Sequence, residues 1–360
     1  MIVTEPRRRR LPSRALAVLA AILMIGASVA VRELVIDGDD EGGGTPSTGG
    51  DLRIACIEEL RAACEALAAG DDDLEVVVEP AGATADPASA ETPFDAWVTY
   101  APWAGVVIDT RDRAGLDPLF DDELPEPLAR SPLVFVARTD RAETLTAECG
   151  GEVTWPCVGD VAGLPWSDIG GSEAWGRIRP AHANPLTNAD GLLALGHAVG
   201  TFAATDEIPP DSVTRIDWDT DEFASWFPRL ERAIPADAFT RGDPFQRFLR
   251  GRLTATYDVV ATTEAAALTA LAAAAPDVRQ AATVLYPAPV ATADVVLVPV
   301  TGADLADLDE DVRTALAESG FRVGDEIPTG APGAPALPET DGLPSPGSLV
   351  ALQDRWKRVQ

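Results

Sequence analysis

Hydrophobic and polar positions divide the chain into an apolar N-terminal segment and a body of alternating short strands and helices. In the body, runs of aliphatic and β-branched residues alternate with segments whose apolar residues recur at helical spacing. Strands are predicted at 52–55, 74–78, 95–99, 133–137, 255–260, 283–285 and 295–300, and helices at 58–69, 192–203, 264–274, 309–319 and 349–359. The run at 133–137 is apolar throughout, which predicts a central parallel strand. This alternation is typical of a layered α/β fold.

The first 31 residues have the pattern of an export segment. Five arginines within 1–14 precede an uncharged apolar run at 15–31. A basic flank stays on the cytoplasmic side, so we expect the chain after Arg32 to be translocated. The run has the minimum length of a spanning helix, and the small residues ending at Ala30 form a site for a signal peptidase. The sequence therefore predicts a single-pass cell-membrane protein with an extracellular body, or a secreted protein if the signal peptide is cleaved near Ala30.

Charge and motif content narrow the classes of function. The chain has 58 acidic and 28 basic residues and a formal net charge of −30, so we expect no nucleic-acid partner. It contains no Walker loop, dinucleotide fingerprint, H-E-x-x-H or G-x-S-x-G motif. With His182 and His197 as its two histidines, it has little material for a histidine triad or a metal site. We expect no enzyme activity, no cofactor and no metal.

Four cysteines form two local pairs with the same separation of eight positions. In an oxidising compartment, an even and locally paired set of cysteines predicts disulfides. A zinc site would need closer cysteine pairs or nearby histidines. Three connectivities are open, and we favour Cys56–Cys64 with Cys149–Cys157.

The order of several short segments carries a resemblance to a known family. These segments are the opening strand at 52–55, Pro-Phe-Asp-Ala-Trp at 93–97, the run at 128–136, the turn at 183–191, the strand and turn at 257–264, and Leu-Tyr-Pro at 285–287. In this order the chain resembles a type II bacterial extracellular solute-binding protein, the two-lobed class that includes molybdate-binding proteins. Gly-Phe-Arg at 320–322 precedes a proline-rich stretch and a helix with a Trp. In this respect the chain is most similar to the solute-binding segment of actinobacterial surface proteins that carry a von Willebrand factor A domain.

The resemblance implies a two-lobed periplasmic-binding-protein-like type II α/β fold, in which each lobe is a mixed sheet flanked by helices, behind an N-terminal transmembrane helix. The expected divisions are a cytoplasmic basic flank at 1–14, a transmembrane or signal segment at 15–31, a flexible linker at 32–50, lobe 1 at 51–132 plus 258–323, lobe 2 at 133–257, and a Pro/Gly-rich tail with a terminal helix at 324–360.

The resemblance also implies that the lobes close over a small ligand, with an ABC-type transporter or a surface protein as a further partner. The ligand-binding residues expected from it are Thr99, Tyr100, Ser131, Thr187, Asn188, Thr262, Thr263 and Tyr286. Where oxyanion receptors place small hydroxyl residues after the first strand, this chain has Glu58 and Glu59. Carboxylates would oppose an anion, so the ligand is not expected to be molybdate or sulfate.

The alternative function is a ligandless surface module that uses the same fold to bind a protein partner. An open polar cleft would count against this alternative, whereas a cleft filled by Trp or Leu side chains would favour it.

Overall fold

The computed structural model describes residues 52–71, 73–84, 94–254, 256–303, 305, 308–324, 327–328, 331 and 333–360. The predicted basic flank, apolar segment and linker at 1–50 lie outside the described residues. Within the described ranges, no helix combines the length and the apolar character needed to cross a bilayer. Residues 51–360 form one unit by their internal contacts.

One path of paired strands runs through the body in the order β2-β1-β3-β8-β4-β6-β5, with β7 also paired to β4. The first half of this path contains β1 (Leu52–Ile57), β2 (Leu74–Glu79), β3 (Ala96–Tyr100) and β8 (Thr292–Pro299). Strand β1 is parallel to both β2 and β3, whereas β8 is antiparallel to β3. We call these strands and their covering helices the first half of the body.

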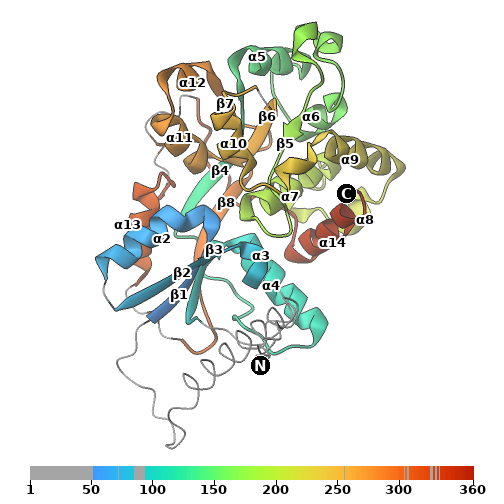
Figure 1. The fold of residues 1–360 in the computed structure, drawn as a ribbon. Helices are drawn as coiled ribbons and strands as arrows, with labels where there is room; N and C mark the ends of the chain where they lie inside the picture. The colour runs from blue at the N-terminus through green and yellow to red at the C-terminus, as the bar shows by residue number, and fades with distance from the viewer. Residues whose placement is uncertain are drawn as a thin grey trace, which may run out of the picture. The chain divides into compact units, whose positions relative to one another are not determined.

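The second half is built on β4 (Ala129–Arg138), β5 (Pro180–Ala181), β6 (Val259–Thr263) and β7 (Ala282–Leu285). The beginning of β4 pairs with β8, and its continuation from residue 133 pairs with β6 and β7. Strands β4 and β8 therefore join the two halves, as Figure 1 shows.

The prediction of a central parallel strand at 133–137 was wrong in its direction. Strand β4 is central and almost completely buried, but β6, β7 and β8 all run antiparallel to it. A continuous apolar run records burial on both faces of a strand, and helices cover both faces of a mixed sheet as they do in a parallel one. The sequence signal therefore reported burial and carried no information on strand direction.

Among the described residues, five helical segments belong to the first half. They are η1 (Glu58–Leu60), α2 (Arg61–Gly70), α3 (Ala81–Thr84), α4 (Ala101–Ala114) and α13 (Leu308–Glu318). Helix α2 packs on α13, and α4 packs on β3 and β8 (Figure 1). The buried residues of α2 are Ala63, Cys64 and Leu67. They lie on one face of the helix, because Leu67 follows the other two by four and three positions.

The second half carries the remaining helices that precede the tail. They are α5 (Thr139–Glu148), α6 (Trp155–Val161), η2 (Trp166–Ile169), η3 (Glu173–Trp175), α7 (Ala189–Ala203), η4 (Pro210–Ser212), α8 (Arg215–Trp218), α9 (Asp221–Ala233), η5 (Ala236–Ala238), α10 (Pro244–Arg250), α11 (Glu264–Ala273) and α12 (Pro276–Ala281). Helix α7 is buried along nearly its whole length, because α6, β6 and the C-terminal helix all contact it.

The expected division placed residues 258–323 in lobe 1, but the strand pairing places the first part of this range elsewhere. Strands β6 and β7 both pair with β4, so residues 259–285 lie in the second half rather than with lobe 1. The chain returns to the first half with β8. The segment at 257–264 identifies a strand and the start of a helix, but it does not specify which strand is the partner.

The C-terminal tail docks on both halves of the body. Helix α14 (Pro346–Lys357) packs on α4 of the first half and on α7 of the second half (Figure 1). The indole Nε1 of Trp356 donates a hydrogen bond to Glu231 Oε2 in α9 at 2.7 Å. The ring of Pro346 lies so close to Gly105 that a side chain at that position would overlap it. The tail is therefore part of the packed body.

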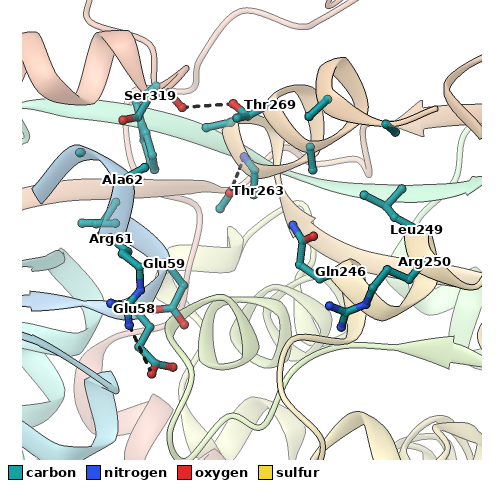
Figure 2. Close-up of a pocket in the computed structure, with 18 of the residues that line it drawn as sticks. Glu58, Glu59, Arg61, Ala62, Gln246, Leu249, Arg250, Thr263, Thr269 and Ser319 are labelled. Carbon is teal, nitrogen blue, oxygen red and sulfur yellow. Dashed lines mark hydrogen bonds and ion pairs between the residues drawn. The ribbon is translucent and has the colours of Figure 1, made fainter. Parts of the chain in front are cut away.

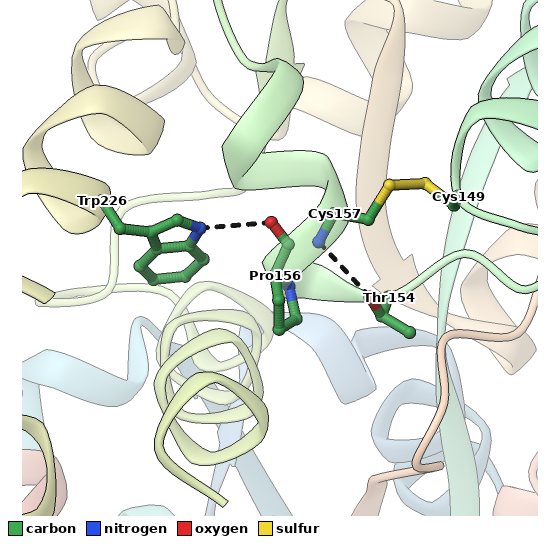
Figure 3. The surroundings of a disulfide bond; sticks show 5 residues. All are labelled: Cys149, Thr154, Pro156, Cys157 and Trp226. Carbon is green, nitrogen blue, oxygen red and sulfur yellow. Dashed lines mark hydrogen bonds between the residues drawn. A yellow bond between two sulfur atoms is a disulfide. The ribbon is translucent and has the colours of Figure 1, made fainter. Parts of the chain in front are cut away.

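Both predicted disulfides are confirmed. Cys56–Cys64 links β1 to α2 with the Cα atoms 6.6 Å apart, and Cys149–Cys157 links the end of α5 to α6 with the Cα atoms 5.8 Å apart. Figure 3 shows the second bridge beside the start of α6, where the Thr154 hydroxyl accepts a hydrogen bond from the Cys157 amide at 3.3 Å. The first bridge braces the strand–helix turn that carries Glu58 and Glu59.

Candidate functional site

A cleft opens between the two halves of the body. It consists of two adjoining cavities of about 550 and 730 Å³, which we call the acidic end and the apolar end. Both cavities are lined by Glu58, Glu59, Arg61, Gln246, Thr263 and Ala266, so they form one continuous groove. Figure 2 shows the two glutamates and Arg61 on the wall formed by η1 and α2, and Gln246 on the opposite wall formed by α10.

Four of the eight predicted ligand-binding residues line the acidic end. These are Thr187, Asn188, Thr262 and Thr263. Asn188 and Thr263 cap helices, since their side-chain oxygens accept hydrogen bonds from the Gly191 amide at 2.9 Å and the Ala266 amide at 3.4 Å. Two helices therefore begin at the cleft, and Asp190 and Ala266 in their first turns line it.

The other four predicted residues are not among the described residues that line the cleft: Thr99, Tyr100, Ser131 and Tyr286. Thr99 and Ser131 are fully buried, and Ser131 Oγ accepts a hydrogen bond from the Ala265 amide at 3.0 Å. The Tyr286 hydroxyl donates to Glu264 Oε2 at 2.6 Å. The structure thus gives Ser131 and Tyr286 partners within the protein, close to the strands that join the two halves.

Tyr100 lies beneath the cleft. It is fully buried in β3, and its hydroxyl donates a hydrogen bond to Asp190 Oδ1 at 3.2 Å. Thr262 Oγ1 donates to the other oxygen of Asp190 at 3.0 Å. Asp190 lines the acidic end, so Tyr100 supports a cleft residue from below.

A pair of carboxyl groups in the acidic end was not among the predicted ligand-binding residues. Glu59 comes from η1 in the first half and Asp190 from the first turn of α7 in the second half. Glu59 Oε1 accepts a hydrogen bond from the Ala189 amide at 2.8 Å, which brings the two carboxyl groups close together. Glu59 Oε2 is shut off from solvent and has no hydrogen-bond partner in the described structure.

The surroundings of this pair favour the protonated carboxyl. Burial, followed by the nearby charge of Asp190, raises the pKa of Glu59 to about 8. Burial, followed by the charge of Asp243, raises the pKa of Asp190 to about 6. No Arg, Lys or His of the described residues forms an ion pair with either carboxyl. Near neutral pH the pair therefore holds a proton, and its negative charge has no counter-cation.

The two halves touch at the edge of the acidic end. The Gly82 amide of α3 donates a hydrogen bond to the Thr187 carbonyl at 3.3 Å. A Cβ atom at residue 82 would overlap the carbonyl oxygen of Leu186. Glycine is required here because two backbone segments from different halves approach each other without room for a side chain.

The apolar end is lined mainly by small and aliphatic side chains. These include Leu249, Ala270, Ala273, Ala274, Val278 and Phe321, with Gln246 and Arg250 beside them. The two other arginines at this end are paired, Arg61 with Glu58 and Glu65, and Arg252 with Asp277. The groove therefore offers an apolar surface next to an acidic one. In the part of the chain that the structure describes, no group of three or more His, Cys, Asp or Glu residues is placed to hold a metal ion.

No protein-family model and no curated protein sequence matches the chain. Solved structures that resemble it include binding proteins for small solutes. The sulfate-binding protein SubI of Mycobacterium tuberculosis H37Rv is 13% identical, with a TM-score of 0.48 over 77% of this chain and 88% of that one. A periplasmic thiamin-binding protein is 11% identical, with a TM-score of 0.47 over 89% of this chain and 99% of that one.

The periplasmic molybdate-binding protein of Azotobacter vinelandii is 11% identical, with a TM-score of 0.41 over 75% of this chain and 98% of that one. All three TM-scores lie below 0.5, so the ligands of these proteins are not carried over to this chain. The resemblance to surface proteins with a von Willebrand factor A domain stays a prediction.

Proposed function

We propose that the chain is an extracytoplasmic solute-binding protein that captures a small ligand in the cleft between its halves. The observation that carries this proposal is a continuous open groove lined by polar groups from both halves. Strands β4 and β8 connect the halves, and such crossovers can act as hinges for closure around a ligand. Cavities of this size match the usual range of small-molecule sites.

The N-terminal segment would hold this body at the outer face of the membrane. On this proposal, residues 15–31 are the anchor and residues 32–50 are a flexible spacer, and cleavage near Ala30 would release the body instead. A body held there could deliver its bound solute to an ABC-type transporter in the same membrane. The similarity to the solute-binding segment of actinobacterial surface proteins belongs to the same proposal.

The rival function, a ligandless module that binds a protein partner, receives less support from the cleft. No Trp is among the described residues that line it, and Leu60 and Leu249 lie at its apolar end without closing the groove. The acidic end remains open and polar. An open polar cleft supports solute binding over a scaffold role.

A variant that fills the cleft tests the proposal. Gln246 is exposed on α10 and lines both cavities, so Gln246→Trp should block the groove without disturbing the core. We expect at least one solute from a library of amines, amino acids, sugars and oxyanions to raise the melting temperature of the full chain. The same solute should leave the melting temperature of Gln246→Trp unchanged.

Gln280→Trp is the matched control, because Gln280 is exposed on α12 and does not line the cleft. This control should respond to the solute as the unmodified chain does. If no solute shifts the unmodified chain, or if Gln246→Trp responds equally, the protein does not bind solutes in this cleft.

A further inference from the structure

The acidic end of the cleft has an excess of negative charge. Among the described residues that line it, four are acidic, namely Glu58, Glu59, Asp190 and Asp243, and the basic one is Arg61. Arg61 lies 3.9 Å from Glu58 and 3.6 Å from Glu65, so its charge is already shared between two carboxylates. A ligand entering this end therefore meets a negative potential.

The inner carboxyl pair lacks any compensating charge. The groups that donate hydrogen bonds to Glu59 and Asp190 include the Ala189 and Thr263 amides and the hydroxyls of Tyr100 and Thr262, all of them neutral. Two half-buried carboxyl groups that lie close together without a counter-cation are costly to ionise. A cation in the adjoining cavity would offset this cost, whereas an anion would increase it.

Other groups at this end suit an organic cation. The half-buried ring of Phe239 lines the cavity, and the face of an aromatic ring attracts ammonium groups. The Thr187 side chain is exposed there, and its hydroxyl can accept a hydrogen bond from an ammonium. A metal ion is less suited, because no group of three or more metal-ligating side chains is placed together among the described residues.

The apolar end specifies the remainder of the ligand. It continues directly from the acidic end and is lined by side chains such as Ala270, Ala274 and Val278. Burial of a hydrocarbon against this surface is favourable, whereas a strongly hydrated group would lose its water there. The charged and apolar parts of a bound molecule would therefore lie at opposite ends of the groove.

We propose that the ligand of the cleft is a small organic cation whose ammonium group lies beside Glu59 and Asp190 and whose apolar part lies along the alanine-lined wall. This proposal rests on the proposed solute-binding function and specifies its substrate class. According to this proposal, oxyanions do not bind in the cleft, and neutral molecules of the same shape bind with lower affinity than cations.

Three probes of equal length and different charge test this ranking. Hexylammonium, hexan-1-ol and hexanoate are titrated into the full chain at pH 8 by isothermal titration calorimetry. We expect hexylammonium to bind more tightly than hexanoate by about tenfold or more, as expected for an uncompensated charge in a partly desolvated site. Hexanoate or hexan-1-ol binding as tightly as hexylammonium would overturn the proposal, and so would the absence of hexylammonium binding.

A charge-neutral variant assigns the effect to the carboxyl pair. Glu59→Gln keeps the shape and the acceptor for the Ala189 amide. It should weaken hexylammonium binding by about fivefold or more through the lost Coulomb attraction and leave hexan-1-ol binding unchanged. Glu143→Gln on the exposed face of α5, away from the cleft, is the control and should change neither. An unchanged hexylammonium affinity in Glu59→Gln would remove the pair from the site.

The pH dependence gives a readout that a purely structural role would not produce. A bound cation favours the ionised forms of Glu59 and Asp190, so hexylammonium affinity should rise between pH 6 and 9, where an alkylamine remains protonated. The other titratable or charged groups that face the pair are Tyr100, whose pKa burial raises well above its ordinary value, Asp243, whose pKa desolvation raises, and Glu58 and Arg61 at the cavity wall. A flat profile would contradict the proposal.

Failure of this proposal is distinguishable from failure of the solute-binding function. A sugar or an oxyanion that stabilises the unmodified chain but not Gln246→Trp would preserve the function and overturn the cationic ligand. If no solute of any charge stabilises the chain, both are wrong.

Discussion

Glu59 makes the stability of the folded chain depend on pH. Its pKa is about 8 in the folded state, compared with an ordinary value of 4.5, so the folded chain holds a proton that the unfolded chain has released. The stabilisation from this proton is complete below about pH 4.5 and is lost as the pH rises to about 8. Glu59→Gln should therefore come close to the original stability near pH 5 and exceed it near pH 9 by up to about 4 kcal/mol, because the pKa of Glu59 rises from 4.5 to about 8 and each pKa unit corresponds to about 1.4 kcal/mol.

Thermal or urea unfolding at these two pH values measures the difference. Glu143→Gln, which removes an exposed carboxylate from α5, should leave the pH dependence unchanged. An equal effect of Glu59→Gln at both pH values would mean that the proton is not held by Glu59.

At the scale of secondary-structure elements, α14 contacts α4 of the first half and α7 of the second half, and so helps to hold the two halves together. Trp356 is buried, its ring packs edge-on against Phe239 with the centroids 5.0 Å apart, and its Nε1 donates to Glu231. Trp356→Ala should lower the free energy of unfolding by about 3–5 kcal/mol, as large-to-small changes in a core do. Urea denaturation measures this loss.

Lys357 offers the control in the same helix, since it is exposed and paired with Asp354 at the surface. Lys357→Ala should change the stability by less than about 0.5 kcal/mol. If Trp356→Ala is equally mild, α14 does not brace the body.

At the scale of the whole molecule, the close approach of the halves depends on Gly82. A side chain at this position would meet the backbone of residue 186, so Gly82→Ala should force the halves apart at the acidic end. The Ala189 amide, which is hydrogen-bonded to Glu59 across the cleft, should then exchange with solvent faster by about tenfold, because the opening costs less free energy.

Hydrogen–deuterium exchange of peptides that contain Ala189 measures this effect. Gly70→Ala is the matched control, because nothing lies within 4 Å of a Cβ atom at that position. Unchanged exchange in Gly82→Ala would show that the contact tolerates a side chain and that the halves are not held by it.

Half of the ligand-binding residues that the family resemblance implies line the candidate site. Thr187, Asn188, Thr262 and Thr263 were predicted as cleft residues and line the acidic end. They lie where α7 and α11 begin, and the sequence marks such starts by a capping residue before an apolar helix. Tyr286 was expected from the Leu-Tyr-Pro turn at 285–287, yet its hydroxyl donates a hydrogen bond to Glu264 inside the body.

The carboxyl pair could not be found in this way. Glu59 is visible as an acidic residue after the first strand, and Asp190 as an acidic residue at a helix start. Nothing in their local sequence relates them, because they are 131 positions apart and come from opposite halves of the body. Their shared proton and their lack of a counter-cation arise only when α7 and η1 meet.

The sequence by itself determined the features that depend on residues close together along the chain. The spacing of apolar residues located strands and helices, and the capping residues located helix starts. The local pairing of the cysteines favoured Cys56–Cys64 and Cys149–Cys157 among three connectivities, and the structure has these two disulfides. Only the tertiary structure decided the direction of the neighbours of β4, the return of β6 and β7 to that strand, and the meeting of Glu59 with Asp190. The physical reason is that periodicity and capping act over a few residues, whereas strand pairing and charge proximity depend on the path of the whole chain.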